Sequence, residues 1–164
     1  MECPIARSLE ETGDGWTLLI LRNALLGARR FQDFQERLGI APNTLSRRLE
    51  RLVELGFFTR ERYTAHPPRE EYELTAKGLD FVPVLLALAA WGNRWVMRDA
   101  VAIECMDPNS GQKVDPVLID RHTRRELVAG AVGLCAGPRA SRQLRHALKR
   151  GVVLGAKRQP RVAP

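Results

Sequence analysis

The sequence predicts a mainly helical fold with a small β component, of the α+β class. Two observations support this prediction. Apolar residues recur at helical spacing through most of the first 100 residues, and one stretch with period-2 alternation interrupts them at residues 57–74. The chain has 164 residues, of which 45% are hydrophobic and 27% charged, so one domain with a core plus an appendage is expected and a wholly disordered protein is excluded.

Cysteine usage and hydropathy exclude two other classes of protein. The three cysteines, at positions 3, 105 and 135, are too scattered for a disulfide-rich secreted domain. The N-terminus lacks a basic region followed by an apolar run. The longest strongly apolar stretch, residues 82–90, is about half of the ~20 residues that span a bilayer. We therefore expect a soluble cytoplasmic protein.

Charge is distributed unevenly along the chain. The formal net charge is +7, but residues 139–164 carry eight Arg or Lys side chains and no acidic one, which leaves residues 1–138 at −1. Such a basic tail either contacts the phosphates of a nucleic acid or is a solvated chain end, and the sequence leaves both interpretations open. Arg outnumbers Lys 22 to 4. Arg suits phosphate and guanine contacts, although GC-rich genomes also favour it.

Four short helices are predicted in the first part of the chain, at residues 4–11, 16–26, 31–38 and 41–55. The second contains only Arg22 and Asn23 as strongly polar residues, a pattern typical of a helix that is buried on most sides. A glycine follows each of the last three helices and ends it. In the fourth helix, Leu45, Leu49 and Leu52 form the stripe that should face the core.

A β-hairpin is predicted next. Residues 57–63 alternate with period 2, residues 64–69 form a turn that contains two consecutive prolines, and residues 70–74 form the second strand. The prolines should stiffen the basic tip of this hairpin.

A long helix is predicted from Thr75 to about residue 98, with a kink at Pro83. Between residues 81 and 91 it is apolar on all sides, which a surface helix of a small monomer would not be, so we expect a second subunit to cover one side. Trp91 and Trp95 stand one helical turn apart and either pack in this dimer core or line an effector pocket.

Beyond residue 100 the pattern weakens. Two short strands are predicted at residues 101–106 and 114–119, and a short basic helix at residues 142–150.

Three helices followed by a hairpin is the element order of a winged helix-turn-helix. On the outward face of the 41–55 helix, Asn43 and Arg47 come first, and the acidic Glu50 and Glu54 follow. The residues on the shoulders of this face are Thr44, Ser46 and Arg51. A recognition helix that enters a major groove by its N-terminal end needs this order of residues, because acidic side chains near the C-terminal end of the helix lie away from the DNA phosphates. In the hairpin, Arg69 is placed to reach a minor groove.

The first 95 residues resemble the HxlR-type winged-helix transcriptional regulators, which are related to the MarR group. The matching stretches are CPIARSLE (3–10), GDGWTLLILRNALLGARRF (13–31), LSRRLERLVELGFF (45–58), PPREEYELTAKG (67–78) and VPVLLALAAWG (82–92). The last of these fits the long dimerisation helix of the family. DPVLID (115–120), followed by Thr123 and Arg125, is similar to a C-terminal extension found in some members.

The resemblance implies a dimeric regulator that binds double-stranded operator DNA. The positions where the family's recognition helix meets bases and phosphates are occupied here by Asn43, Thr44, Ser46, Arg47 and Arg48. Arg69 falls at the family's wing tip and Trp16 at its core tryptophan. Two departures stand out: Ala41 replaces a helix-capping Ser, and Glu70 places a negative charge in the wing where an apolar residue is common.

Five of the candidate residues have a second interpretation, and for Arg47 and Arg69 it is a solvated surface arginine. Arg48 lies nearer the apolar stripe than Arg47, so it either contacts DNA or pairs with a nearby acid. Arg51 is a further candidate for DNA contact, or a solvated arginine. Cys3 precedes the first helix, where some family members carry a redox-sensing thiol, and it is otherwise an inert cysteine.

The sequence thus predicts three parts: a DNA-binding and dimerisation domain (1–99), a small β-containing extension (100–138) and a basic, partly disordered tail (139–164). The predicted function is sequence-specific regulation of transcription by a homodimer, most simply repression, with a small molecule or an oxidant as effector. The alternatives are a redox-responsive regulator that senses through Cys3, and a nonspecific nucleic-acid binder driven by the tail. No catalytic motif, cofactor site, metal site or membrane contact is predicted.

Overall fold

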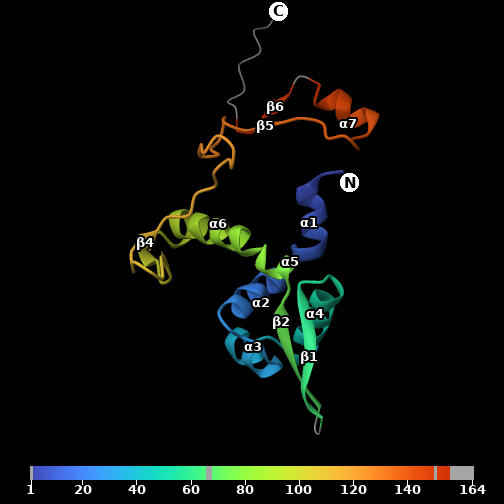
Figure 1. Ribbon diagram of the computed structural model, residues 1–164, viewed down its shortest axis with the longest axis vertical. Helices are drawn as coiled ribbons and strands as arrows, with labels where there is room; N and C mark the ends of the chain where they lie inside the picture. Colours follow the sequence, from blue (N-terminus) through green and yellow to red (C-terminus); the bar gives the residue numbers. More distant parts are fainter. Residues whose placement is uncertain (1, 66–67, 150, 156–164) are drawn as a thin grey trace, which may run out of the picture. The chain divides into compact units, whose positions relative to one another are not determined.

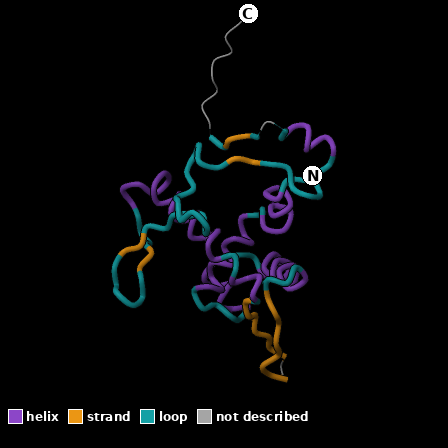
Figure 2. Tube along the Cα trace, turned by 45° about the horizontal axis from the view of Figure 1, so that its top comes forward, coloured by secondary structure: helices purple, strands orange, loops and turns teal. Residues whose placement is uncertain are grey.

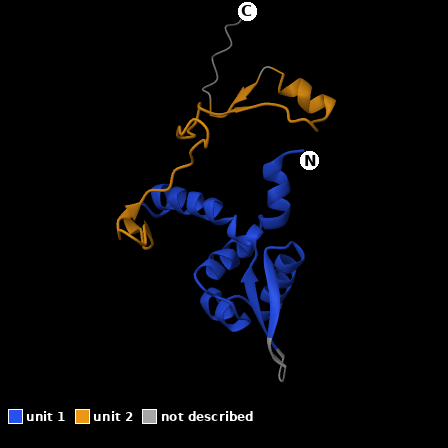
Figure 3. Cartoon of the chain, viewed as in Figure 1, with its two compact units in different colours: residues 1–98 blue, residues 99–164 orange. Residues whose placement is uncertain are grey.

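The computed structural model describes residues 2–65, 68–149 and 151–155, and it divides into two compact units (Figure 3). The first unit ends at Arg98 and the second begins at Asp99. The helices of the first unit are α1 (Pro4–Thr12), α2 (Gly15–Leu25), α3 (Phe31–Leu38), α4 (Pro42–Glu54), α5 (Ala76–Leu79) and α6 (Val82–Gly92), and its strands are β1 (Phe58–Ala65) and β2 (Pro68–Leu74) (Figure 1). The mainly helical fold with small antiparallel sheets is as predicted.

Local capping sets where the helices of the first unit begin and end. Asp14 precedes α2, and its carboxylate accepts a hydrogen bond of 3.0 Å from the backbone N–H of Thr17. Asp33 accepts hydrogen bonds from the backbone N–H groups of Arg30 and Arg29 at the start of α3, at 2.9 and 3.1 Å. No side chain caps α4, because Ala41 has no acceptor to offer. Gly39 ends α3 in the left-handed conformation, with φ of 60°.

One apolar core holds the first unit together. Phe34 lies at its centre, with edge-to-face contacts to Phe58 and Tyr72 at ring-centroid distances of 6.2 and 6.3 Å. The other core residues are Ile20, Leu21, Ala28, Ile40, Leu45, Leu49, Leu52 and Phe57. They come from α2, the loops around α3, α4 and the wing, so this core fixes the helix-turn-helix against the base of the hairpin.

The β1–β2 hairpin is the wing, and it is longer than predicted. The two strands form the orange hairpin in Figure 2. Their register pairs Phe58 with Leu74 and Arg62 with Glu70, and an irregularity follows before Thr64 pairs with Arg69. The predicted strands were too short at the tip, because backbone pairing continues into the segment that was assigned to a turn. Of the turn predicted at residues 64–69, residues 66–67 lie outside the described residues, and the second of its two prolines, Pro68, begins β2.

The single long helix predicted from Thr75 is wrong. The chain forms the short α5, passes through Asp80 and Phe81, and begins α6 just before Pro83, because a proline without an N–H fits the first turn of a helix and not its middle. A five-residue π-helical turn, Asn93–Met97, follows α6, and a 3-10 turn, Arg98–Ala100, ends the helical stretch. Gly78 in α5 lies against the hairpin base, where a Cβ atom would come within about 2.5 Å of the Phe57 carbonyl oxygen.

The second unit contains little regular structure. Its elements are β3 (Cys105–Met106), β4 (Lys113–Val114), β5 (Gly133–Leu134), α7 (Arg142–Ala147) and β6 (Val152–Val153), with β3 paired to β4 and β5 to β6. The six-residue strands predicted at 101–106 and 114–119 were too long, because the described residues of the second unit form no core that would bury one face of such strands. The basic helix predicted at 142–150 is present but ends at Ala147. Among the described residues, no helix is long and apolar enough to cross a membrane.

Candidate nucleic-acid interface

Helix α4 presents two different faces. Leu45, Leu49 and Leu52 are buried against the core, at 0 to 1% exposure. The opposite face is open, and the exposed residues on it are Asn43, Arg47, Glu50, Arg51 and Glu54. Thr44, Ser46 and Arg48 lie between the two faces and are half-buried. Burial of the leucine stripe therefore turns the N-terminal polar residues of α4 toward solvent.

The three arginines of α4 differ in what they contact. Arg48 forms an ion pair of 3.3 Å with Asp14, the capping residue of α2, which is the acid partner that the second interpretation of Arg48 requires. Arg51 pairs with Glu54 one turn further along α4, at 3.1 Å. Among the described residues, none forms a hydrogen bond or an ion pair with the side chain of Arg47. Arg47 thus keeps all five of its N–H donors available to an external acceptor.

In the wing, Arg69 is exposed on β2, opposite Thr64 of β1. The acidic residues that follow Arg69 are each matched by an arginine: Glu70 by Arg60 at 3.5 Å, Glu71 by Arg30 at 2.8 Å, and Glu73 by Arg29. The negative charge of β2 is thereby compensated within the protein, so the wing repels a phosphate backbone less than its sequence suggests.

These ion pairs are the feature that sequence reasoning missed. Two of them join the α2–α3 loop to the wing, and a backbone hydrogen bond of 2.8 Å from the Tyr72 N–H to the Arg29 carbonyl oxygen reinforces them. The partners are more than 40 residues apart in sequence. The only signal in the sequence is the coincidence of two adjacent arginines with an acid-rich strand.

The other candidate residues belong to elements outside α4 and the wing. Cys3 is exposed, carries a free thiol and occupies the position just before α1. Trp91 and Trp95 are each 57% exposed, whereas Trp16, which the resemblance places in the core, is 37% exposed at the surface of α2. Within the described part of the chain, no group of three or more His, Cys, Asp or Glu residues is arranged to hold a metal ion.

Comparison with known proteins gives a consistent picture. The profile of the HxlR-like helix-turn-helix family matches residues 11–100. The uncharacterized HTH-type transcriptional regulator MT3179 of Mycobacterium tuberculosis is 42% identical over 135 residues, which cover 82% of this chain and 85% of that protein. The HTH-type transcriptional regulator sll1512 of Synechocystis is 35% identical over 99 residues, covering 60% of this chain and 73% of that protein.

Solved structures extend the similarity to the fold. PA1374 of Pseudomonas aeruginosa, a candidate transcription factor, is 43% identical with a TM-score of 0.64, over 89% of this chain and 100% of its own. The redox regulator HypR in its reduced form is 30% identical with a TM-score of 0.54, over 59% of this chain and 99% of its own. The chain belongs to the HxlR-like helix-turn-helix family and is a transcriptional regulator with a helix-turn-helix DNA-binding domain.

Proposed function

We propose that the protein is a homodimeric, sequence-specific repressor in which α4 is the recognition helix. The observation that carries this proposal is the open N-terminal half of α4, where Asn43 and Arg47 are exposed. Arg binds a guanine edge and Asn an adenine edge through two hydrogen bonds each, in the major groove. Glu50 and Glu54 lie nearer the C-terminal end of α4, so the N-terminal end enters the groove first.

The remaining candidate residues are assigned to positioning on the DNA backbone. Thr44, Ser46 and Arg48 lie at the side of the exposed face of α4, and Arg51 lies further along that face. Arg69 in the wing is assigned to the neighbouring minor groove. Because these contacts neutralise phosphates, the affinity for DNA should fall steeply as the salt concentration rises.

The proposed dimer rests on an apolar surface of α6 and the turn that follows it. Phe81 and Leu85 pack against the core of the first unit. The outer stripe of the helix consists of Val84, Leu88, Trp91 and Trp95, each between 48% and 57% exposed. A stripe of this size at helical spacing is typical of a subunit interface. Two subunits would then place their α4 helices in successive major grooves, ~34–36 Å apart.

The experiment that tests this function is fluorescence anisotropy with the DNA immediately upstream of the protein's own gene and a shuffled duplex of equal length, over a salt series. A specific regulator should prefer its operator by roughly 10³-fold or more. Equal affinity and equal salt dependence for the two duplexes would overturn the proposal of sequence-specific binding.

A matched pair of variants tests the role of α4. Arg47→Ala removes a base contact and should weaken operator binding by about 1–3 kcal/mol, with relaxed specificity at the base pair it reads. Arg22→Ala removes an exposed arginine of α2 in the same unit and should leave the affinity unchanged. If both variants bind as the wild type does, α4 is not the recognition helix.

A second candidate function, redox-responsive regulation, is favoured by one observation. Cys3 is an exposed free thiol, and the structurally similar HypR is described as a redox regulator. An oxidised Cys3 would act by changing the angle or spacing of the two recognition helices. Cys3→Ser should leave operator binding intact and abolish its loss under diamide treatment. An unchanged diamide response in this variant would remove Cys3 from the mechanism.

A further inference from the structure

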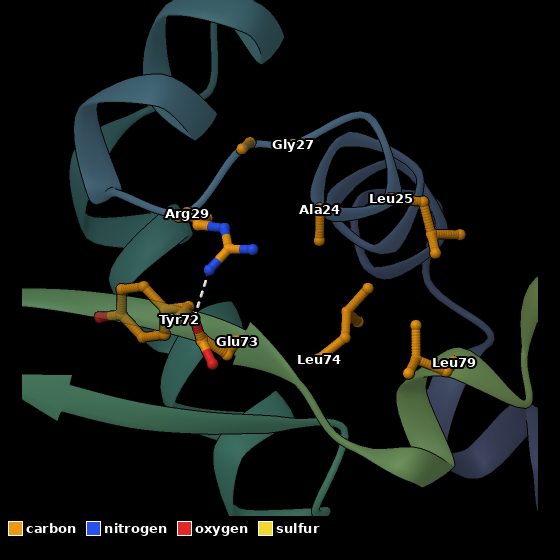
Figure 4. A pocket seen from close by; sticks show the side chains of 9 residues that line it. Ala24, Leu25, Gly27, Arg29, Tyr72, Glu73, Leu74 and Leu79 are labelled. Atoms are coloured by element: carbon orange, nitrogen blue, oxygen red, sulfur yellow. Dashed lines mark hydrogen bonds and ion pairs between the residues drawn. The ribbon is translucent and has the colours of Figure 1, made fainter.

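A cavity of about 340 Å³ lies beside the base of the wing in the first unit (Figure 4). The end of α2 and the loop after it form one wall, β2 a second wall, and Leu79 of α5 a third. The volume is within the range of small-molecule sites, about 300–1,000 Å³. The cavity therefore has room for one small ligand. Such a ligand would contact α2, the β2 strand of the wing, and α5, which precedes α6.

The lining of this cavity combines apolar side chains with one ion pair at its edge. Ala24, Leu25, Leu74 and Leu79 surround the central space, and the Arg29 guanidinium extends toward the Glu73 carboxylate beside it (Figure 4). Apolar walls with a few charged groups are the composition that binds the body and the polar end of a small molecule.

The charges around the cavity are balanced, and Arg29 is the group there with donors to spare. The Asp33 carboxylate accepts hydrogen bonds from the backbone N–H groups of Arg29 and Arg30 and remains an anion. Arg37, whose Nη1 donates to the carbonyl oxygen of Leu26 at 3.1 Å, offsets the charge of Asp33. Arg29 contacts Glu73 through Nη1 alone, and a guanidinium has further donors for a second carboxylate.

We propose that this cavity binds a small carboxylate with an apolar body, whose carboxylate group takes the place of Glu73 on Arg29. The apolar body then lies against Ala24, Leu25 and Leu79. Exchange of one carboxylate for another keeps the Arg29 charge compensated, and the displaced Glu73, whose side chain is 47% exposed, is left to solvent, so burial of the apolar body drives binding.

The position of the cavity gives such a ligand a way to affect DNA binding, a consequence that rests on the proposed function. The Arg29–Glu73 pair is one of two ion pairs that hold the α2–α3 loop to β2, and the Arg30–Glu71 pair at 2.8 Å is the other. A ligand that takes Arg29 from Glu73 weakens this attachment, loosens the wing relative to α4 and lowers the affinity for the operator.

The test is isothermal titration calorimetry of the full chain without DNA. The probes are benzoate, benzylamine and benzyl alcohol, which share a phenyl ring and are an anion, a cation and a neutral molecule. Benzoate should bind most tightly. Arg29→Gln should weaken benzoate binding at least about tenfold, because it removes a charge-assisted contact. Glu73→Gln should tighten it by about threefold, because the competing carboxylate is gone. The matched control Arg22→Gln lies outside the cavity and should change nothing.

Several results would overturn the proposal: no measurable benzoate binding, tighter binding of benzylamine, or weaker benzoate binding in Glu73→Gln. A second variant, Ala24→Phe, fills the cavity and should abolish benzoate binding while circular dichroism shows the chain folded. Benzoate binding that survives Ala24→Phe places the ligand elsewhere and rejects the site. Since no DNA is present, the site and the proposed repressor function fail independently. Release of the operator by benzoate is then measured separately by anisotropy.

Discussion

The first unit buries eleven residues in one core, whereas Ala140 is the single hydrophobic residue that is buried among the described residues of the second unit. The second unit is not short of apolar side chains. Val117, Leu118, Val128 and Val153 are among those that it exposes, each by more than 45%. Local hydrogen bonds shape it instead: Asp120, for example, accepts from the backbone N–H of Thr123 at 3.1 Å and from its hydroxyl at 2.6 Å.

The first unit is therefore stabilised by packing between distant residues, and the second by hydrogen bonds within short turns. Long-range packing makes the position of α4 and the wing depend on one another, so damage to the core should remove DNA recognition as a whole. Turns closed by their own aspartates constrain only a few residues each, so damage in the second unit should remain local.

The largest effect is expected for Phe34→Ala, which empties the centre of the core. Loss of the Phe34 ring and of its contacts with Phe58 and Tyr72 should destabilise the first unit by about 3–5 kcal/mol. The matched change in the second unit, Leu154→Ala at a side chain that is 46% exposed, should cost about 0.5 kcal/mol or less. Urea unfolding followed by circular dichroism measures both, and equal losses would show that the second unit has a packed core of its own.

Next in size is the loss of the proposed dimer. Leu88→Glu places a charge in the outer stripe of α6 and should convert the dimer to a monomer, because a carboxylate cannot be buried there without a partner. Operator affinity should then fall by about 10²-fold or more, since the α4 recognition helices of the two subunits are no longer linked. Light scattering after size-exclusion chromatography measures the mass. Leu118→Glu, at an equally apolar and 63% exposed site in the second unit, is the control and should stay dimeric.

Sequence predicted the first unit well because its signals are local. The leucine stripe of α4 and the glycines after α2, α3 and α4 determine helix type and ends within a few residues. Period-2 alternation located the wing, and the order of these elements indicated a winged helix-turn-helix, which the family match confirms. The open face of α4 follows from the same stripe, and the DNA-contact roles of its residues stay a prediction.

The features that sequence did not predict depend on contacts between distant residues. The links from Arg29 and Arg30 to the wing require the hairpin to be folded back beside α2. The cavity beside them is left between elements whose packing no local pattern specifies. The break between α5 and α6 has a local cause, Pro83, but a kink and an interruption leave the same mark in a sequence.

A smaller effect is expected from the basic tail, residues 139–164, of which residues 150 and 156–164 lie outside the described part of the chain. Arg142, Arg145 and Lys149 are exposed at and just after α7. Deletion of the tail should keep the operator preference and reduce the salt dependence of binding, because only phosphate contacts are lost. The anisotropy series measures both quantities. If deletion removes nearly all binding to operator and shuffled DNA alike, the tail, and not α4, carries the affinity.

The smallest effect concerns Asp33 and acid. The backbone N–H groups of Arg30 and Arg29 hold the pKa of its carboxyl below the ordinary value of 3.8. The folded protein therefore binds fewer protons here than the unfolded chain does, so this contribution is present above about pH 4 and is lost as the pH falls through the lowered pKa. Because Asp33 is well solvated, the contribution should be on the order of 0.5 kcal/mol. In thermal unfolding between pH 6 and pH 3, Asp33→Asn should lose less stability than the wild type. Glu36→Gln, an exposed change on the same helix, should follow the wild-type curve. Parallel curves for Asp33→Asn and the wild type would show that these hydrogen bonds do not favour the ionised carboxylate, and that α3 is held at its start by packing of the core alone.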